Sequence, residues 1–190
     1  MAAESGVKLV PFDRSFLSAV RSWILDPETR DLVGTVRPPS DGQHERWYEE
    51  LQSDRRRHVA IIADQRGTPR GIIGLFDIDQ VYRKAELWIY VGEAGSRRGG
   101  TGRAAVGQML AFAFDTLGLH RIYVHVFSFN EPGAAFFRSL GFVDEGTERD
   151  AVFKRGRFFD VHLLSMLEGD FRAGPRSGKD GADRPPRQRR

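Results

Sequence analysis

The chain has 190 residues, of which 40% are hydrophobic, so it can bury one sizeable core and is neither a disordered nor a fibrous chain. Cysteine is absent, which excludes disulfides and thiolate chemistry, and the five histidines show no metal-ligand spacing, so no metal site is expected. No stretch approaches the roughly 18 apolar residues of a membrane span, and no long apolar segment begins the chain, which predicts a soluble, cytoplasmic protein.

The first elements that the pattern predicts are a strand and an amphipathic helix. Residues 7–11 form a strand-like run. The large apolar residues that follow are spaced by four, as on one face of a helix. They are Phe16, Val20 and Ile24.

A long segment, residues 26–43, contains three prolines and separates this helix from the next predicted one, residues 44–51. A loop of that length in a compact domain is more often functional than idle, so we predict a substrate lid. The helix that follows carries two large aromatic side chains, and its Trp47 is a candidate substrate contact.

Six strand-like runs and two helical patterns occupy the rest of the domain. The first two strands flank a turn with glycine and proline, which predicts a hairpin. This order of elements predicts a mixed α/β (α+β) fold, with helices that cover a mixed sheet. The strands are expected at 58–63, 71–78, 84–91, 121–127, 142–153 and 158–166, and the helices at 104–117 and 132–140. His125 and His162 lie inside strand runs and are interpreted as ordinary packed histidines.

The end of the chain differs in composition from the rest. Residues 172–190 hold seven Lys or Arg and two Asp, so the net charge of this segment is +5. Because the net charge of the whole chain is +3, the first 171 residues have a net charge of −2. No apolar side chain larger than alanine follows Phe171, so this segment cannot bury enough surface to offset its ordering entropy. We therefore expect a folded domain over residues 1–170 and a basic, disordered tail over residues 171–190.

A glycine-rich loop joins the strand at 84–91 to the helix at 104–117. Glycines leave backbone N–H groups uncovered, and the start of a helix adds its own donors and the positive end of its dipole, which suits a phosphate group. The spacing fits neither the Walker loop nor the strict dinucleotide fingerprint. An ordinary tight turn is the alternative. The loop residues are Arg97, Arg98, Gly99, Gly100, Thr101, Gly102 and Arg103.

The loop and the strand before it resemble the GNAT acetyltransferase superfamily. The loop has the acetyl-CoA pattern Arg/Gln-x-x-Gly-x-Gly/Ala. Residues 85–91 are similar to the fourth strand of the family, with Glu86 eleven residues before Arg97, a spacing that looks like that of members with a catalytic glutamate.

Two further features extend the resemblance over about residues 7–168. Residues 130–142 are similar to the family pattern Asn-x-x-Ala-x-x-x-Tyr-x-x-x-Gly-Phe, with Gly133 in place of the alanine and Phe137 in place of the tyrosine. The start of the chain, with Arg21-x-Trp23, looks like the branch that includes ribosomal-protein N-terminal, spermidine and amino-sugar acetyltransferases.

The resemblance implies a GNAT-like central sheet, mostly antiparallel, whose fourth and fifth strands splay apart. It also implies acetyl-CoA as the cosubstrate, with its pyrophosphate on the glycine loop and its pantetheine arm along the fourth strand. In the family a tyrosine at the position of Phe137 protonates the departing thiolate. The expected contacts outside the loop are Tyr90, Val91, Gly92, Asn130 and Phe137, and the alternative proton donors are Tyr90, Tyr123, Ser128, Ser139 and water.

Glu86 is predicted to be the general base. An ammonium with a pKa near 10.4 is less than about 1% neutral at pH 7, so an amine must lose a proton before it attacks. A carboxylate beside it can take that proton directly or through water. On its own strand face Glu86 is flanked by Trp88, a candidate substrate contact, and by Tyr90. The alternative is an ordinary strand carboxylate paired with Lys84 or an arginine.

These residues predict an N-acetyltransferase that moves acetyl from acetyl-CoA to a small-molecule primary amine of amino-sugar, aminoglycoside or polyamine type. Attack would be direct, since no cysteine exists to carry an acyl group. The alternatives are a ribosomal-protein type N-terminal acetyltransferase and a non-catalytic acyl-CoA sensor. A homodimer is expected from the resemblance, and nucleic-acid binding is disfavoured because the basic tail lacks interleaved aromatics.

Carboxylates that could face a cationic acceptor include Asp77, Asp79, Asp144, Glu145, Glu148 and Asp150.

Overall fold

The computed structural model describes residues 6–27, 30, 32, 39–92 and 100–174. Within these residues, seven strands form one sheet in the order β1-β2-β3-β4-β5-β7-β6. Every neighbouring pair is antiparallel except β4 and β5, which are parallel. The predicted mixed, mostly antiparallel sheet is therefore confirmed.

The strands begin and end within two residues of their predicted bounds, because period-2 alternation is a local property of the sequence. They are β1 (Val7–Pro11), β2 (His58–Asp64), β3 (Pro69–Asp79), β4 (Lys84–Val91), β5 (Arg121–Phe127), β6 (Val143–Lys154) and β7 (Arg157–Leu167). The helices are α1 (Leu17–Leu25), α3 (Asp41–Ser53), α4 (Thr101–Ala111), α5 (Glu131–Ser139) and α6 (Glu168–Ala173), with the 3-10 turn η1 (Arg14–Phe16) and the π-helical turn η3 (Phe112–Thr116).

Two helices begin earlier than predicted. Helix α3 starts at Asp41, inside the predicted loop, because the hydroxyl of Ser40 accepts from the Gln43 N–H while the Gln43 side chain accepts from the Ser40 N–H. This capping box satisfies two backbone donors at once. Helix α4 starts at Thr101 because Gly100 adopts the left-handed conformation before it. Half of the predicted lid, at positions 28–29, 31 and 33–38, lies outside the described residues.

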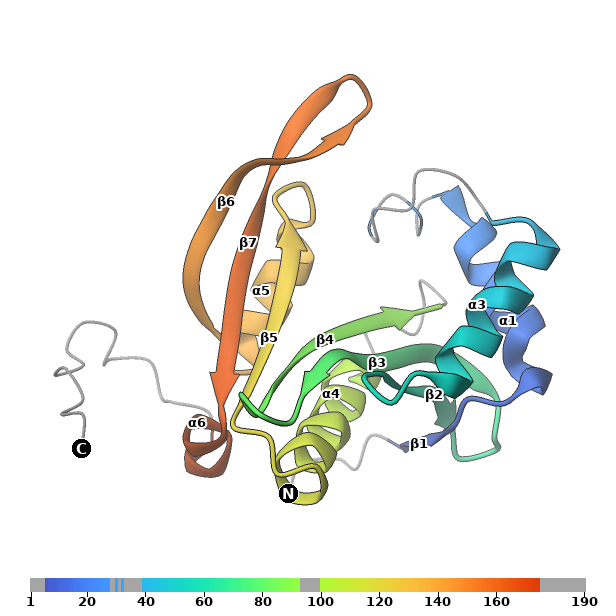
Figure 1. Cartoon of the computed structure of the whole chain (residues 1–190), viewed down its shortest axis with the longest axis horizontal. Coiled ribbons are helices and arrows are strands. Elements are labelled where there is room, and N and C mark those ends of the chain that lie inside the picture. Colours follow the sequence, from blue (N-terminus) through green and yellow to red (C-terminus); the bar gives the residue numbers. More distant parts are fainter. Residues whose placement is uncertain (1–5, 28–29, 31, 33–38, 93–99, 175–190) are drawn as a thin grey trace, which may run out of the picture.

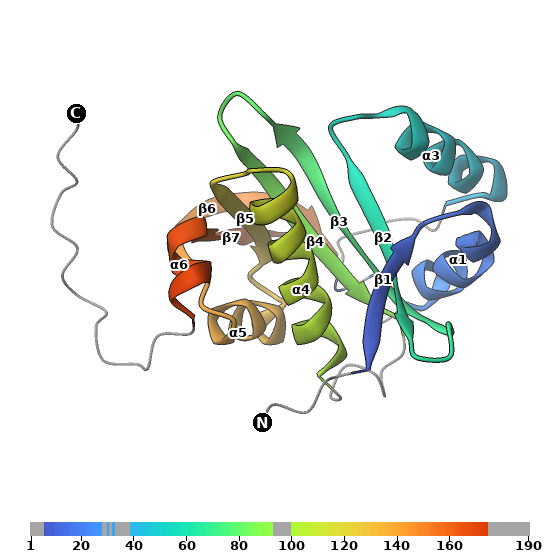
Figure 2. The same ribbon diagram turned by 90° about the horizontal axis from the view of Figure 1, so that it is seen from below.

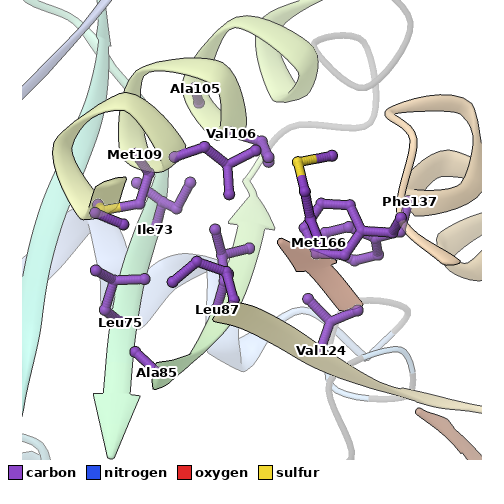
Figure 3. Packing of buried hydrophobic residues seen from close by; sticks show 14 of the residues in the cluster. Ile73, Leu75, Ala85, Leu87, Ala105, Val106, Met109, Val124, Phe137 and Met166 are labelled. Carbon is purple, nitrogen blue, oxygen red and sulfur yellow. The ribbon is translucent and has the colours of Figure 1, made fainter. Parts of the chain in front are cut away.

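Helices cover both faces of the sheet (Figure 2). Helices α4, α5 and α6 pack on one face, where β3, β4 and β5 contribute their alternate apolar side chains to the larger core cluster. Figure 3 shows Leu75 and Leu87 of the strands beneath the α4 side chains Val106 and Met109, with Val124 beside Met166 and Phe137. Helices α1 and α3 cover the opposite face with a second cluster. The even-numbered residues of β4 from Glu86 to Tyr90 therefore share the face of α1 and α3.

Strands β4 and β5 are paired over a short distance only. The parallel ladder joins Lys84 to Arg121, Ala85 to Ile122 and Glu86 to Tyr123. Beyond Glu86 the two strands diverge, so that they form a V (Figure 1). This confirms the predicted splay, and it places Glu86 at the apex of the V.

The folded domain continues past its predicted end at residue 170. Helix α6 runs to Ala173, and the Phe171 ring lies 5.3 Å from the Phe114 ring of η3, centroid to centroid. Phe171 thus joins the core because η3 supplies an aromatic partner that local composition does not reveal. None of the helices in the described part of the chain is long and apolar enough to cross a membrane.

Candidate active site

Glu86 lies at the apex of the V formed by β4 and β5, with 29% of its side chain exposed. It pairs with Phe76 of β3 on one side and with Tyr123 of β5 on the other. The ion pair with Lys84 or an arginine, which was the alternative to a general base, does not form among the described residues. The carboxylate contacts a histidine instead.

His125 of β5 provides that contact. Its Nδ1 lies 2.9 Å from Glu86 Oε1, and its Nε2 lies 3.7 Å from Glu148 Oε1 of β6. The sequence analysis interpreted His125 as an ordinary packed residue, and this was wrong because its side chain is 31% exposed and bridges two carboxylates. Strand alternation could have found it, since His125 shares its face with Tyr123.

Tyr123 lies beside these groups. Its ring meets the His125 imidazole edge-on at 5.6 Å between centroids. Burial raises the pKa of the Tyr123 phenol, and the negative charges of Glu86 and Asp77 raise it further. The hydroxyl therefore keeps its proton at neutral pH and can act as a proton donor.

Asp77 lies near this group, on a bulge of β3. The β3–β4 pairing shifts between Phe76 and Asp79, and Asp77 has a left-handed φ of 47°. Its carboxylate accepts a hydrogen bond from Arg56 at 3.1 Å. Its negative charge contributes to the raised pKa of the Tyr123 phenol.

The two predicted tryptophan contacts pack against the cluster under α1 and α3. The Trp88 ring lies 5.3 Å from the Phe76 ring, and its buried Nε1 has no hydrogen-bond partner in the described part of the chain. Trp47 stacks on His44 at 5.2 Å and contacts Phe12 at 5.7 Å. Trp88 is two residues from Glu86 on the same face, whereas none of these contacts brings Trp47 to Glu86.

The glycine loop is described from Gly100 onward, and Arg97, Arg98 and Gly99 lie outside the described residues. Gly100 is the N-cap of α4, with φ 78° and no side-chain hydrogen bond to the helix amides. Gly102 passes close to Phe136 of α5, since a Cβ on it would lie 3.3 Å from the Phe136 ring. The start of α4, including Thr101, therefore presents backbone amides without a capping side chain.

Arg103 has a partner within the protein. Its guanidinium donates to the hydroxyl of Ser139 at 2.9 Å and to the Ser139 carbonyl at 3.3 Å, which ties α4 to α5. The Ser139 hydroxyl in turn donates to the Phe136 carbonyl at 2.7 Å. Ser139 is thus held between two groups, away from the role of proton donor.

Tyr90 and Gly92 have packing roles at the end of β4. The buried Tyr90 hydroxyl donates to the Trp23 carbonyl at 3.0 Å. A Cβ on Gly92 would lie 2.3 Å from the Trp23 indole, so only glycine lets Trp23 pack there. Val91 pairs with Gly71 of β3. Contacts of these three residues with a cosubstrate stay a prediction.

Asn130 caps α5, as its position before the helix predicts. Its side-chain oxygen accepts from the Gly133 N–H at 3.0 Å. A Cβ on Gly133 would lie 2.7 Å from the Asn130 amide nitrogen, which gives a physical reason for glycine at that position. Phe137 is buried in the core, with its ring 5.2 Å from those of Phe136 and Phe142, and Figure 3 shows it pointing into the larger cluster.

One hollow among the described residues lies between β1, β2 and the ends of α3 and α4 and has a volume of about 610 Å³. None of the predicted site residues lines it. Of the predicted site residues, Glu86 and Asp77 lie near the apex of the V, together with Tyr123, which was predicted only as an alternative proton donor. The chemistry found there, a carboxylate with a histidine and a phenol, is suited to proton transfer.

Residues 7–143 match the sequence model of the family described as acetyltransferase (GNAT) domain. The chain belongs to the GNAT acetyltransferase family. This confirms the resemblance and the predicted class of enzyme, an N-acetyltransferase. The matched residues include strands β1 to β5, the glycine loop and Glu86.

Relatives of this GNAT protein include spermidine N(1)-acetyltransferase of Vibrio cholerae, 28% identical over 111 residues, which are 58% of this chain and 64% of the relative. The chain therefore spans less than two thirds of that relative. YdaF of Bacillus subtilis, whose name proposes a ribosomal N-acetyltransferase, is 30% identical over 149 residues, with 78% of each chain covered.

The fold is also that of solved structures. A spermidine N-acetyltransferase from Vibrio cholerae, in complex with CoA and spermine, superposes with a TM-score of 0.83 at 23% identity. The superposition covers 88% of this chain and 99% of that one. At this level of identity the likeness shows the shared GNAT fold.

Proposed function

We propose that this GNAT protein transfers the acetyl group of acetyl-CoA to a primary amine of a polycationic small molecule of polyamine type, with Glu86 as the general base. The position of Glu86 carries this proposal: it ends the β4–β5 ladder, is partly exposed, and contacts His125 instead of a neutralising Lys or Arg. Relatives named as spermidine acetyltransferases support the polyamine class.

The proton is the main obstacle to the reaction. Freeing the lone pair of an alkylammonium at pH 7 costs about 4 to 5 kcal/mol, at about 1.36 kcal/mol per pKa unit. Glu86 is proposed to receive this proton, after which the neutral amine attacks the acetyl carbonyl carbon. As the C–S bond breaks, the nitrogen loses a second proton to solvent, the new amide keeps the acetyl group, and CoA leaves as a thiolate that takes up a proton.

Negative charge around Glu86 favours a polycation over a neutral amine. Glu148 lies beyond His125, whereas the charge of Asp77 on the β3 bulge is partly offset by Arg56, 3.1 Å away. Of the nearby cations, Arg121 is already bound to Glu145, and this contact lowers the pKa of the Glu145 carboxyl. Carboxylates at the apex can therefore attract the additional ammonium groups of a polyamine.

The start of α4 fits the diphosphate of acetyl-CoA. Its amides carry no side-chain cap, and Gly100 and Gly102 leave the backbone open to close approach. The bound cosubstrate supplies an activated acetyl thioester. We propose that Thr101 and the amides near it bind the anion, while Arg103 stabilises the loop through Ser139.

The leaving thiolate needs a proton, and Phe137 cannot give one. Among the alternative donors, Tyr90 and Ser139 donate their hydrogens to carbonyl groups. Tyr123 faces the apex with a raised pKa and is adjacent to Glu86. We propose Tyr123 as the general acid.

A second candidate function is acetylation of a protein N-terminus, which the likeness to YdaF favours. An N-terminal peptide would need an open groove, and part of the predicted lid at 26–43, which would close or leave open such a groove, lies outside the described residues. A non-catalytic sensor is a third candidate because Phe137 replaces the family tyrosine. A homodimer also stays a proposal; one Vibrio cholerae relative is described as a dodecamer.

The experiment measures release of free CoA from acetyl-CoA with spermidine, an aminoglycoside, an amino sugar and an N-terminal ribosomal peptide. The variants are Glu86→Gln and, as a matched control, Glu50→Gln on the exposed side of α3. With spermidine we expect kcat near neutral pH to fall at least about tenfold in Glu86→Gln and to stay unchanged in Glu50→Gln. The KM for acetyl-CoA should be unaltered in both.

The outcomes separate the candidates. A peptide-only activity would replace the polyamine proposal with the N-terminal one. Binding of acetyl-CoA without thiol release for any amine would favour the sensor. Equal activity of Glu86→Gln and wild type would remove Glu86 from the mechanism.

A further inference from the structure

His125 occupies a special place at the apex of the V. It lies two residues beyond Tyr123, the last residue of β5 that pairs with β4. Its contact with Glu86 therefore joins the two strands just where their backbone ladder stops. This contact fixes the side chain that the proposed reaction requires.

The chemistry of the two groups in the 2.9 Å contact indicates which atom carries the hydrogen. An ionised carboxylate has no hydrogen to donate, so a hydrogen bond between Glu86 Oε1 and His125 Nδ1 requires the hydrogen to be on Nδ1. The imidazole then donates, and the carboxylate accepts through Oε1. The second carboxylate oxygen, Oε2, is left for another partner.

The imidazole is itself oriented from two more sides. Glu148 of β6 faces Nε2 at 3.7 Å, and the Tyr123 ring packs edge-on at 5.6 Å. Three elements of the sheet thus surround one ring: β4 with Glu86, β5 with Tyr123 and β6 with Glu148. A ring held in this way cannot rotate freely about its side-chain torsions.

We propose that His125 is a positioning residue for the reaction. Its Nδ1–H group holds Oε1 of Glu86, so that Oε2 faces the substrate ammonium. In the reaction the amine N–H bond breaks, its proton passes to Oε2, and His125 keeps the hydrogen on Nδ1. The advantage is entropic, because a half-exposed glutamate has several rotamers and the bond selects one before the substrate binds. This inference rests on the proposed role of Glu86.

The kinetic test compares variants with spermidine as the acceptor. His125→Leu removes the donor, and His125→Asn keeps an N–H near the position of Nδ1. His120→Leu is a matched control, because this histidine lies 3.9 Å from Glu168 and makes none of the contacts described for Glu86. We expect kcat to fall at least about tenfold in His125→Leu, with the KM for acetyl-CoA unchanged, and to be largely restored in His125→Asn.

A double-mutant cycle shows whether His125 acts through Glu86. If it does, adding His125→Leu to Glu86→Gln should reduce kcat less than about twofold further, because the group it positions is already lost. If His125→Leu lowers kcat by the same factor in Glu86→Gln as in wild type, the inference is overturned and His125 has a structural role. A kcat of His125→Leu within about twofold of wild type would also overturn the inference.

A measurement without turnover keeps the inference testable if His125→Leu fails to fold or if no amine is acetylated. Nitrogen-15 NMR of the imidazole in the wild-type protein should show hydrogen on Nδ1 of His125, with a chemical shift that changes in Glu86→Gln. A bare Nδ1 with hydrogen on Nε2 alone would overturn the inference. Absence of acetyl transfer with an intact Nδ1–H signal would instead refute the proposed function and leave the contact established.

Discussion

Tyr123 lies directly opposite Glu86 in the last pair of the parallel β4–β5 ladder. This pair brings a phenol whose pKa is raised, chiefly by burial, beside a carboxylate at the apex of the V. One group can give a proton and the other can take one, so the pair has the two functions that amine acetylation requires.

Tyr123→Phe tests the first of these functions. We expect kcat to fall about tenfold or less, since a thiolate leaves moderately well without a proton. Steady-state rates at pH 7, with Tyr82→Phe as a control on the exposed β3–β4 turn, provide the measurement. An unchanged kcat in Tyr123→Phe would indicate that water protonates the thiolate.

Phe137→Tyr restores the hydroxyl that the family pattern has at this position. Phe137 is 7% exposed and lies among other phenylalanines, so an added hydroxyl without a partner should lower the free energy of unfolding by about 1–3 kcal/mol. We expect no gain in kcat. Urea denaturation against Phe153→Tyr, an exposed phenylalanine on the β6–β7 hairpin, checks the stability effect. A stable variant with higher kcat would instead place position 137 at the reaction.

Acid should destabilise the fold through His44 and His58. Burial lowers the pKa of both side chains, and the Arg21 charge lowers that of His44 further. The unfolded chain therefore binds protons at about pH 6.5 while the folded chain does not, so stability is complete above that pH and falls as the pH drops toward the folded values.

The slope of that loss is at most about 1.4 kcal/mol per pH unit for each histidine. His58→Phe keeps the stack on Phe112, whose ring lies 4.3 Å away, and should flatten the dependence between pH 7.5 and 5.5. Urea midpoints at both pH values measure it. His120→Phe is the exposed control, and an equal slope in wild type and His58→Phe would contradict the assignment.

Truncation tests where the folded domain ends. A chain that stops at Asp170 loses the Phe171 ring and the Arg172 contact with Asp115 at 3.0 Å. We expect its free energy of unfolding to fall by about 1–3 kcal/mol, the transfer value of a partly buried aromatic side chain. A chain that stops at Gly174 should match the full chain. Equal stability of the two truncations would restore the boundary at 170.

The local pattern of the sequence determined most of the architecture. Strands β4 and β5 have the predicted bounds, the hairpin of β2 and β3 forms at its glycine-proline turn, and Asn130 caps α5. Each of these depends on residues within a few positions of one another. Such short-range rules of alternation, turn formation and capping can be applied without knowing the fold.

The tertiary structure alone decided how the site is built. His125 and Glu86 are 39 positions apart, and their contact depends on the parallel register of β4 and β5 and on the point where these strands diverge. The predicted substrate contact Trp47 packs on Phe12 because α3 folds against that face, and it also stacks on His44 of its own helix. Sequence spacing fixes which face of an element a side chain occupies, but its partner is set by how distant elements pack together, and that packing is a property of the whole chain.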